Sequence, residues 1–165
     1  MVSELLLEGL RGAGHIGVGM KPVASGCRVS KDGARSEDAE RLMVASAAPF
    51  PYQVVNPYAF VEPIAPHIAA ELAGRTIDIE VIRANFSQLA RAGRVVVEGI
   101  GGWRVPIGAR RTMADVAVAF ELPVVLVVGV RLGCLNHALL TAEAIAADGA
   151  KLRAVRDASA ADLDA

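Results

Sequence analysis

Apolar residues follow two patterns along the 165-residue chain, and these patterns alternate. In some stretches they recur every three or four positions, as on one face of a helix. In others they form a short unbroken run rich in valine, as in a buried strand. The helical pattern covers residues 4–11, 37–47, 67–73, 78–92, 113–120 and 135–147, and the strand pattern covers residues 15–20, 94–98 and 124–130. Short connectors between them predict an α/β protein with a parallel sheet flanked by helices.

The connectors add further expectations about this fold. Ser36 precedes a helical run as a helix cap does, and Asp32-Gly33 is typical of a turn. Residues 56–66 carry three prolines and read as a long extended loop. The run 124–130 is uniformly apolar, which favours a central strand. Residues 1–150 are expected to form one domain, and 151–165, which lack periodic apolar positions, an irregular tail.

Composition narrows the class of protein. Hydrophobic residues make up 53% of the chain and charged residues 21%, which is typical of a folded domain. The net charge of -1 and the dispersed arginines argue against a nucleic-acid partner. The longest apolar run, residues 122–130, covers about half of the roughly 20 residues that a membrane helix needs. The N-terminus shows no signal-peptide pattern, and Cys27 and Cys134 have no disulfide or zinc spacing, so the expected location is the cytoplasm.

The first candidate site follows the strand at residues 15–20. Lys21 and Ser25 lie four residues apart on a turn with a proline and a glycine, an arrangement that suits binding of an anion or a carbamate. The alternative is an ordinary surface lysine beside a turn, and spacing alone favours that alternative.

The second candidate site follows the strand at residues 94–98. Glu98 ends that strand and precedes a glycine-rich turn whose N–H groups, around Gly101 and Gly102, can bind an anion. Mg²⁺ prefers a few carboxylates with water and phosphate, so Glu98 and Asp38, at a helix start, form a plausible pair. Alternatively, Glu98 is a solvated strand end and Asp38 a charge favoured by the helix dipole.

The third candidate site follows the strand at residues 124–130. Gly133, Cys134, Leu135 and Asn136 begin a helix, whose free N–H groups can bind a carboxylate. A plain strand-to-helix connection explains the same residues. The three histidines lie on separate elements and lack metal-ligand spacing, and no nucleophile elbow is present.

Four segments occur together in the order and spacing of one family. They are residues 19–26, Gly-Met-Lys-Pro-Val-Ala-Ser-Gly; residues 56–67, with Asn-Pro-Tyr, Glu-Pro and Pro-His; residues 97–103, Val-Glu-Gly-Ile-Gly-Gly-Trp; and residues 128–137, from Val-Gly-Val to Asn-His. In these segments the chain resembles dethiobiotin synthetase, over roughly residues 3–148.

The resemblance implies a P-loop NTPase-like three-layer sandwich and a specific reaction. The family joins CO2 or bicarbonate to 7,8-diaminononanoate with Mg-ATP and closes the ring of dethiobiotin, as a homodimer. By resemblance, Lys21 stabilises the carbamate and Ser25 binds substrate, while Asp38 and Glu98 bind Mg²⁺. Gly101 and Gly102 lie near the carbamate. The turn at Gly133, Cys134, Leu135 and Asn136 reaches the substrate carboxylate across the dimer.

The family opens with a strand and a phosphate-binding loop that ends in Gly-Lys-Thr. Met1 stands about where the residue after that threonine falls, and residues 151–165 do not resemble the family's next strand. The sequence therefore predicts a sheet without the phosphate-loop strand and a chain truncated at both ends. The alternative function is a catalytically inactive member that dimerises or binds substrate.

Overall fold

Two parallel strands lie at the centre of the protein. The computed structural model describes residues 2–158. Within them β1 (Gly17–Met20) pairs in parallel with β6 (Arg94–Val97), and Met20 lies opposite Val97. All four residues of β1 are buried, and its apolar side chains belong to the main core together with Ile82 and Leu89. Because the two strands run in parallel, the residues that follow them, Lys21 and Glu98, leave the sheet at the same edge.

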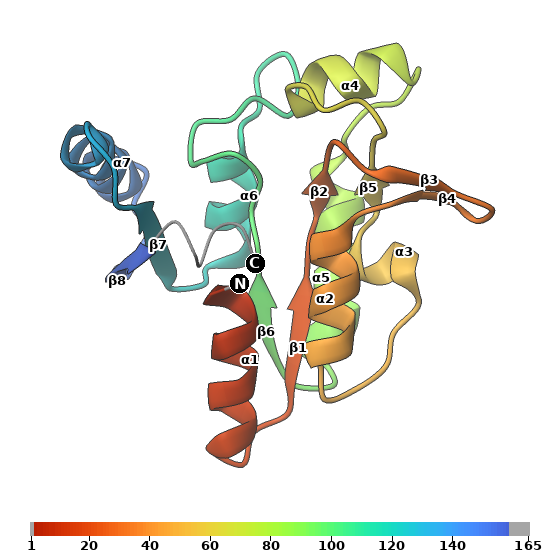
Figure 1. Cartoon of the computed structure of the whole chain (residues 1–165), viewed down its shortest axis with the longest axis horizontal. Coiled ribbons are helices and arrows are strands. Elements are labelled where there is room, and N and C mark those ends of the chain that lie inside the picture. Colours follow the sequence, from red (N-terminus) through yellow and green to blue (C-terminus); the bar gives the residue numbers. More distant parts are fainter. Residues whose placement is uncertain (1, 159–165) are drawn as a thin grey trace.

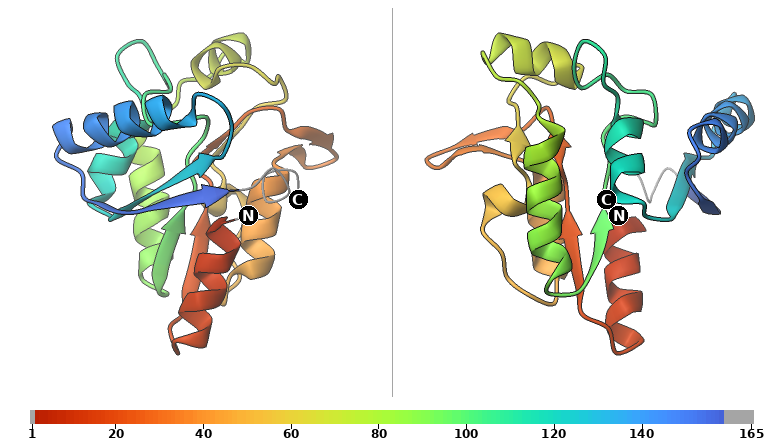
Figure 2. Two further views of the ribbon diagram at one scale, coloured as in Figure 1. Left: turned by 60° about the vertical axis from the view of Figure 1, so that its left-hand side comes forward. Right: turned by 180° about the vertical axis from the view of Figure 1, so that it is seen from behind.

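Helices cover both faces of this strand pair, as Figures 1 and 2 show. Helices α1 (Val2–Gly12) and α2 (Glu37–Ala45) contact one another and lie on one face, and α5 (Ile79–Ala90) lies on the other. Arg41 of α2 forms an ion pair with Glu4 of α1, with Nε and Oε1 2.7 Å apart. The predicted arrangement of parallel strands between helical layers is therefore confirmed.

Short elements surround the carboxyl ends of the central strands. The pairs are β2 (Val23–Ala24) with β5 (Tyr58–Ala59), in parallel, and β3 (Arg28–Ser30) with β4 (Gly33–Arg35), a hairpin whose turn contains Asp32-Gly33 as predicted. Two helices, α3 (Tyr52–Val55) and α4 (Pro66–Leu72), lie nearby. Residues 56–66, expected as an extended loop, are irregular except for β5 and for Pro66, which begins α4. Helix α3 lies just before them and was not expected.

The last third of the described chain forms a separate strand pair, seen at the left of Figure 1. After α6 (Met113–Phe120), β7 (Val124–Gly129) pairs in parallel with β8 (Leu152–Ala158), and α7 (Cys134–Ala147) connects them. The expectation of an irregular tail is wrong for Leu152–Ala158, because these residues add a strand to β7. Residues 159–165, the rest of that predicted tail, lie outside the described residues.

The prediction that residues 124–130 form a central, fully buried strand is also wrong. Strand β7 is largely half-buried, and within residues 2–158 its partner is β8 alone. Its side chains line a cavity instead of packing against a second neighbouring strand. Strand β1, by contrast, is buried at all four residues. Within the described residues, no helix combines the length and the apolar character needed to cross a bilayer.

Close contact between β1 and α2 depends on Gly19. A Cβ atom at this position would lie 2.7 Å from the Cβ of Leu42, which sits on the α2 backbone and cannot swing away. We expect Gly19→Ala to lower the free energy of unfolding by about 1–3 kcal/mol through overpacking. Urea unfolding measures this loss. The matched control is Gly9→Ala in α1, where the added methyl group meets no atom within 4 Å. An equal loss in both variants would contradict the packing explanation.

Candidate active site

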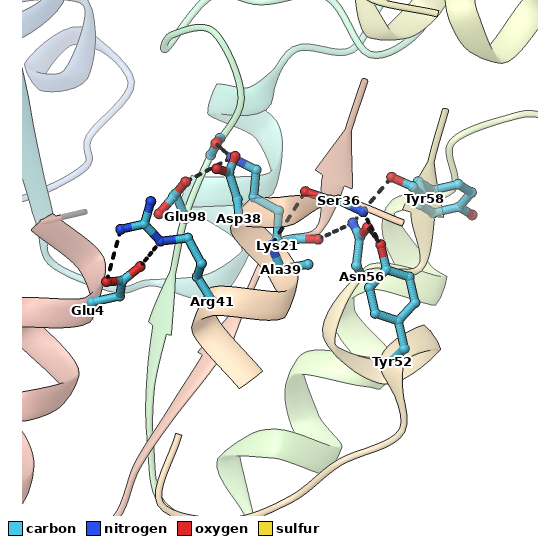
Figure 3. A network of polar contacts seen from close by, with 11 residues as sticks. Glu4, Lys21, Ser36, Asp38, Ala39, Arg41, Tyr52, Asn56, Tyr58 and Glu98 are labelled. Atoms are coloured by element: carbon cyan, nitrogen blue, oxygen red, sulfur yellow. Dashed lines mark hydrogen bonds and ion pairs between the residues drawn. The ribbon is translucent and has the colours of Figure 1, made fainter. Parts of the chain in front are cut away.

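Lys21 is the centre of the candidate site and follows β1 directly. Its side chain is buried, and the ammonium nitrogen lies 2.7 Å from Oδ2 of Asp38 and 2.9 Å from Oε1 of Glu98. It also donates a hydrogen bond of 3.0 Å to the carbonyl oxygen of Gly99. Figure 3 shows the three charged side chains converging from different elements. The structure thus brings together Lys21, Asp38 and Glu98, which the sequence placed in two separate candidate sites.

The two carboxylates are positioned by the ends of regular elements. Asp38 lies in the first turn of α2, where the positive end of the helix dipole favours a carboxylate. Ser36 caps that helix and accepts a hydrogen bond from the N–H of Ala39, as the sequence predicts. Glu98 follows β6, and its N–H donates to the carbonyl oxygen of Met20. The Asp38 side chain is 43% exposed and that of Glu98 20% exposed, so Asp38 is the carboxylate that solvent reaches more easily.

A buried polar network fixes the backbone at Lys21. The side-chain amide of Asn56 donates to the carbonyl oxygens of Lys21 and Tyr58, and its Oδ1 accepts from the Tyr52 hydroxyl. The same hydroxyl accepts from the N–H of Ser36. Burial raises the pKa of Tyr52, which keeps the hydroxyl protonated and able to donate. This network connects α3 to the end of β1 and to the start of α2 (Figure 3).

The glycine-rich turn borders the site on the side of β6. Gly101 has a φ of 68°, and a side chain there would collide with Val105, so the turn requires glycine. Glu98 and the turn line a cavity of ≈ 480 Å³, whose other walls are largely apolar and come from β6, α6 and β7. The exposed Gly101 and Gly102 leave the backbone of the turn accessible to a ligand. A larger hollow of ≈ 930 Å³ lies at the starts of α5 and α6 and does not include Lys21.

The remaining predicted residues lie at two other places. Ser25 is half-buried and comes directly after β2, four residues beyond Lys21. Gly133 has a φ of 90° and caps the N-terminus of α7, so Cys134, Leu135 and Asn136 form the first turn of that helix. Figure 1 and the right view of Figure 2 show β7 and α7 to one side of the β1 and β6 pair. The structure therefore does not join this third segment to Lys21 within one chain.

The charged cluster suits a magnesium ion chemically. Carboxylate oxygen is the ligand that Mg²⁺ prefers, and one or two carboxylates with water and phosphate are its usual set in nucleotide sites. Asp38 and Glu98 both approach one cationic nitrogen, so a single cation can reach both. Within the described residues no cluster of three or more histidine, cysteine, aspartate or glutamate side chains has metal-binding geometry. Asp38 and Glu98 are therefore candidate donors for such a cation.

The two cysteines differ in environment and should differ in reactivity. Burial raises the pKa of the Cys27 thiol, so it stays protonated and unreactive at neutral pH. Cys134 is half-buried at the start of α7. We expect a thiol reagent such as dithionitrobenzoate to modify Cys134 first, with only a slow phase left in Cys134→Ser. Modification of Cys27 at the rate of Cys134 would contradict this expectation.

Comparison with known proteins identifies the family of this chain. A family model described as an AAA domain matches residues 1–155, which places the chain in the P-loop NTPase-like class of α/β proteins. Three relatives carry the name ATP-dependent dethiobiotin synthetase BioD. The protein of Xanthomonas oryzae pv. oryzae is 55% identical over 150 residues, that of Xylella fastidiosa strain Temecula1 54% over 149, and that of Xanthomonas campestris pv. campestris 51% over 150.

Each of these matches covers 90% of this chain, and 66% or 67% of the relative. The chain therefore spans about two thirds of the length of the curated relatives. It belongs to the dethiobiotin synthetase family of ATP-dependent ligases. The resemblance seen in the sequence is confirmed.

Proposed function

We propose that this chain contributes the carbamate-activating centre of a dethiobiotin synthetase, which uses Mg-ATP to carboxylate 7,8-diaminononanoate and close the ureido ring. The observation that carries the proposal is the buried Lys21 ammonium, held between Asp38 and Glu98 beside a glycine turn. Chemistry of this kind needs charge neutralisation and placement of the reacting groups more than covalent catalysis. The site offers charges of both signs and exposed backbone at the edge of the sheet, where α/β proteins bind ligands.

The reaction divides into three steps. One amine of the substrate adds to CO2 and loses a proton, which gives a carbamate. A carbamate oxygen then attacks the γ-phosphorus of ATP and releases ADP, forming a mixed carbamic–phosphoric anhydride. The second amine attacks the carbamate carbon and gives up a proton, which closes the ring and releases phosphate with the oxygen that came from the carbamate.

Lys21 has the central role in this proposal. Its ammonium would pair with the carbamate and with the negative charge that develops during phosphoryl transfer. The side-chain amide of Asn56 donates a hydrogen bond to the carbonyl oxygen of Lys21 and so fixes the backbone at this residue. Asp38 and Glu98 would hold Mg²⁺. When bound, this ion would neutralise negative charge on the phosphates of ATP.

The other predicted residues would bind the substrate. Ser25, Gly101 and Gly102 flank the Lys21 region and would contact the carbamate and amine groups. Gly133, Cys134, Leu135 and Asn136 would bind the substrate carboxylate at the start of α7 of the second subunit in a cytoplasmic homodimer. The exposed apolar residues on this segment, Leu132, Leu135 and Leu139, support a subunit contact there.

The test is formation of dethiobiotin from diaminononanoate, ¹³C-bicarbonate and Mg-ATP by the purified chain, followed by mass spectrometry. The proposal predicts product that carries one ¹³C atom and requires ATP. Diaminononanoate binding without product would favour the alternative, a substrate-binding member of the family without catalytic activity, and would overturn the proposal for this chain.

A further inference from the structure

The Lys21 ammonium lies where a cation bound by both carboxylates would lie. Its nitrogen is within 3 Å of Oδ2 of Asp38 and of Oε1 of Glu98 at once, and it is the ion-pair partner of both. The side chain is 7% exposed, so solvent competes little for these contacts. Lys21 is thus the internal counter-ion of the proposed metal ligands.

A divalent cation and this ammonium compete for the same oxygens. Mg²⁺ binds carboxylate oxygen at about 2.0–2.1 Å and requires near-octahedral geometry. Two cations placed on the same pair of oxygen atoms also repel one another strongly at such short range. One lysine leaves the pair of carboxylates with a single net negative charge, which remains available to attract a divalent ion.

We propose that Lys21 holds Asp38 and Glu98 together while no divalent cation is bound, and that a divalent cation displaces its ammonium from these carboxylates. This inference rests on the proposed function, because it takes Asp38 and Glu98 as the metal ligands. Cation binding thereby frees a buried positive charge beside the Gly99 turn. The freed ammonium then pairs with an anion, so that the site binds its cation and its anionic substrate together.

The first experiment measures Mn²⁺ binding without catalysis, from the electron paramagnetic resonance signal of free Mn²⁺. Lys21→Met removes the internal competitor, and we expect it to bind Mn²⁺ at least about tenfold more tightly than the wild type, within the usual range of coupling between sites. Lys31→Met is the matched control, because it removes the same charge from the exposed turn between β3 and β4. We expect its affinity to match the wild type within about twofold, since exposed charges are screened.

The second experiment uses the wild-type chain and does not depend on the folding of a variant. The chain has three lysines, Lys21, Lys31 and Lys151, so ¹⁵N-labelled lysine gives signals that are simple to assign. Lys21 is buried and hydrogen-bonded, and its ammonium protons should exchange slowly enough to be seen by NMR. Saturating Mg²⁺ should shift this signal or remove it by faster exchange.

The outcomes separate this inference from the proposed function. Equal or weaker Mn²⁺ binding in a folded Lys21→Met variant overturns the displacement, as does a Lys21 signal that is unchanged in Mg²⁺-bound wild type. In both cases the carboxylates still bind metal, and the proposed function stands. If the wild type and Lys21→Met bind no Mn²⁺ at all, the inference and the proposed metal site fail together.

Discussion

Lys21→Ala is expected to lower the rate of dethiobiotin formation by about a hundredfold to a thousandfold, the usual cost of removing one preorganised group that stabilises transition-state charge. Among the ion pairs of the described residues, Lys21 alone pairs with both Asp38 and Glu98. Its loss removes the positive charge proposed for the carbamate. Product formation measured by mass spectrometry gives the rate, and circular dichroism shows whether the variant is folded.

Lys31→Ala is the control for this experiment. It also loses one lysine, but from an exposed turn between β3 and β4. Its rate should match that of the wild type. Equal rates for a folded Lys21→Ala variant and the wild type would show that the chemistry does not depend on this ammonium.

Asn56→Ala is expected to lower the free energy of unfolding by about 2–4 kcal/mol, because it leaves buried polar groups without partners. The Asn56 amide donates to the carbonyl oxygens of Lys21 and Tyr58, and its Oδ1 accepts from the hydroxyl of Tyr52. Asn56 is 2% exposed, so water cannot replace these bonds without local opening. Urea unfolding gives the loss of stability.

The control for this prediction is Asn85→Ala. Asn85 also donates to a carbonyl oxygen, that of Gln53, but this bond is exposed, and water can replace it. We expect a loss well below 1 kcal/mol there, as for most surface substitutions. Similar losses in the two variants would show that burial of the Asn56 network does not stabilise the fold.

Local sequence patterns predicted most regular elements and two parts of the site. A helix cap at Ser36 and a strand formed by the valine run before Glu98 can both be recognised from neighbouring residues in the sequence. The structure has α2 and β6 at these places. The sequence placed Lys21 and Glu98 at the ends of two strands of a parallel sheet. Parallel strands end at the same edge of a sheet, and β1 and β6 are parallel, so the two residues share that edge. Asp38 joins them because α2 begins at the same edge.

Features that depend on distant contacts could not be predicted in this way. The network of Tyr52 and Asn56 involves residues from three elements, and no spacing in the chain indicates that they meet. The same limit applies to β7, whose apolar run indicates a buried strand, whereas its burial depends on which strands lie beside it. The prolines in residues 56–66 suggested a loop, and the short strand β5 inside it depends on pairing with β2, which lies far away in the sequence.

The fate of one oxygen atom tests most directly whether this chain activates a carbamate by phosphorylation. In a short reaction with freshly dissolved ¹⁸O-bicarbonate, diaminononanoate and Mg-ATP, the phosphate released with dethiobiotin is analysed by mass spectrometry. Phosphorylation of the carbamate predicts one ¹⁸O atom in that phosphate, because ring closure breaks the bond between carbon and the bridging oxygen. The control is that unreacted bicarbonate still carries ¹⁸O at the end of the reaction. If it does and the released phosphate carries none, carbamate phosphorylation at the Lys21 centre is contradicted.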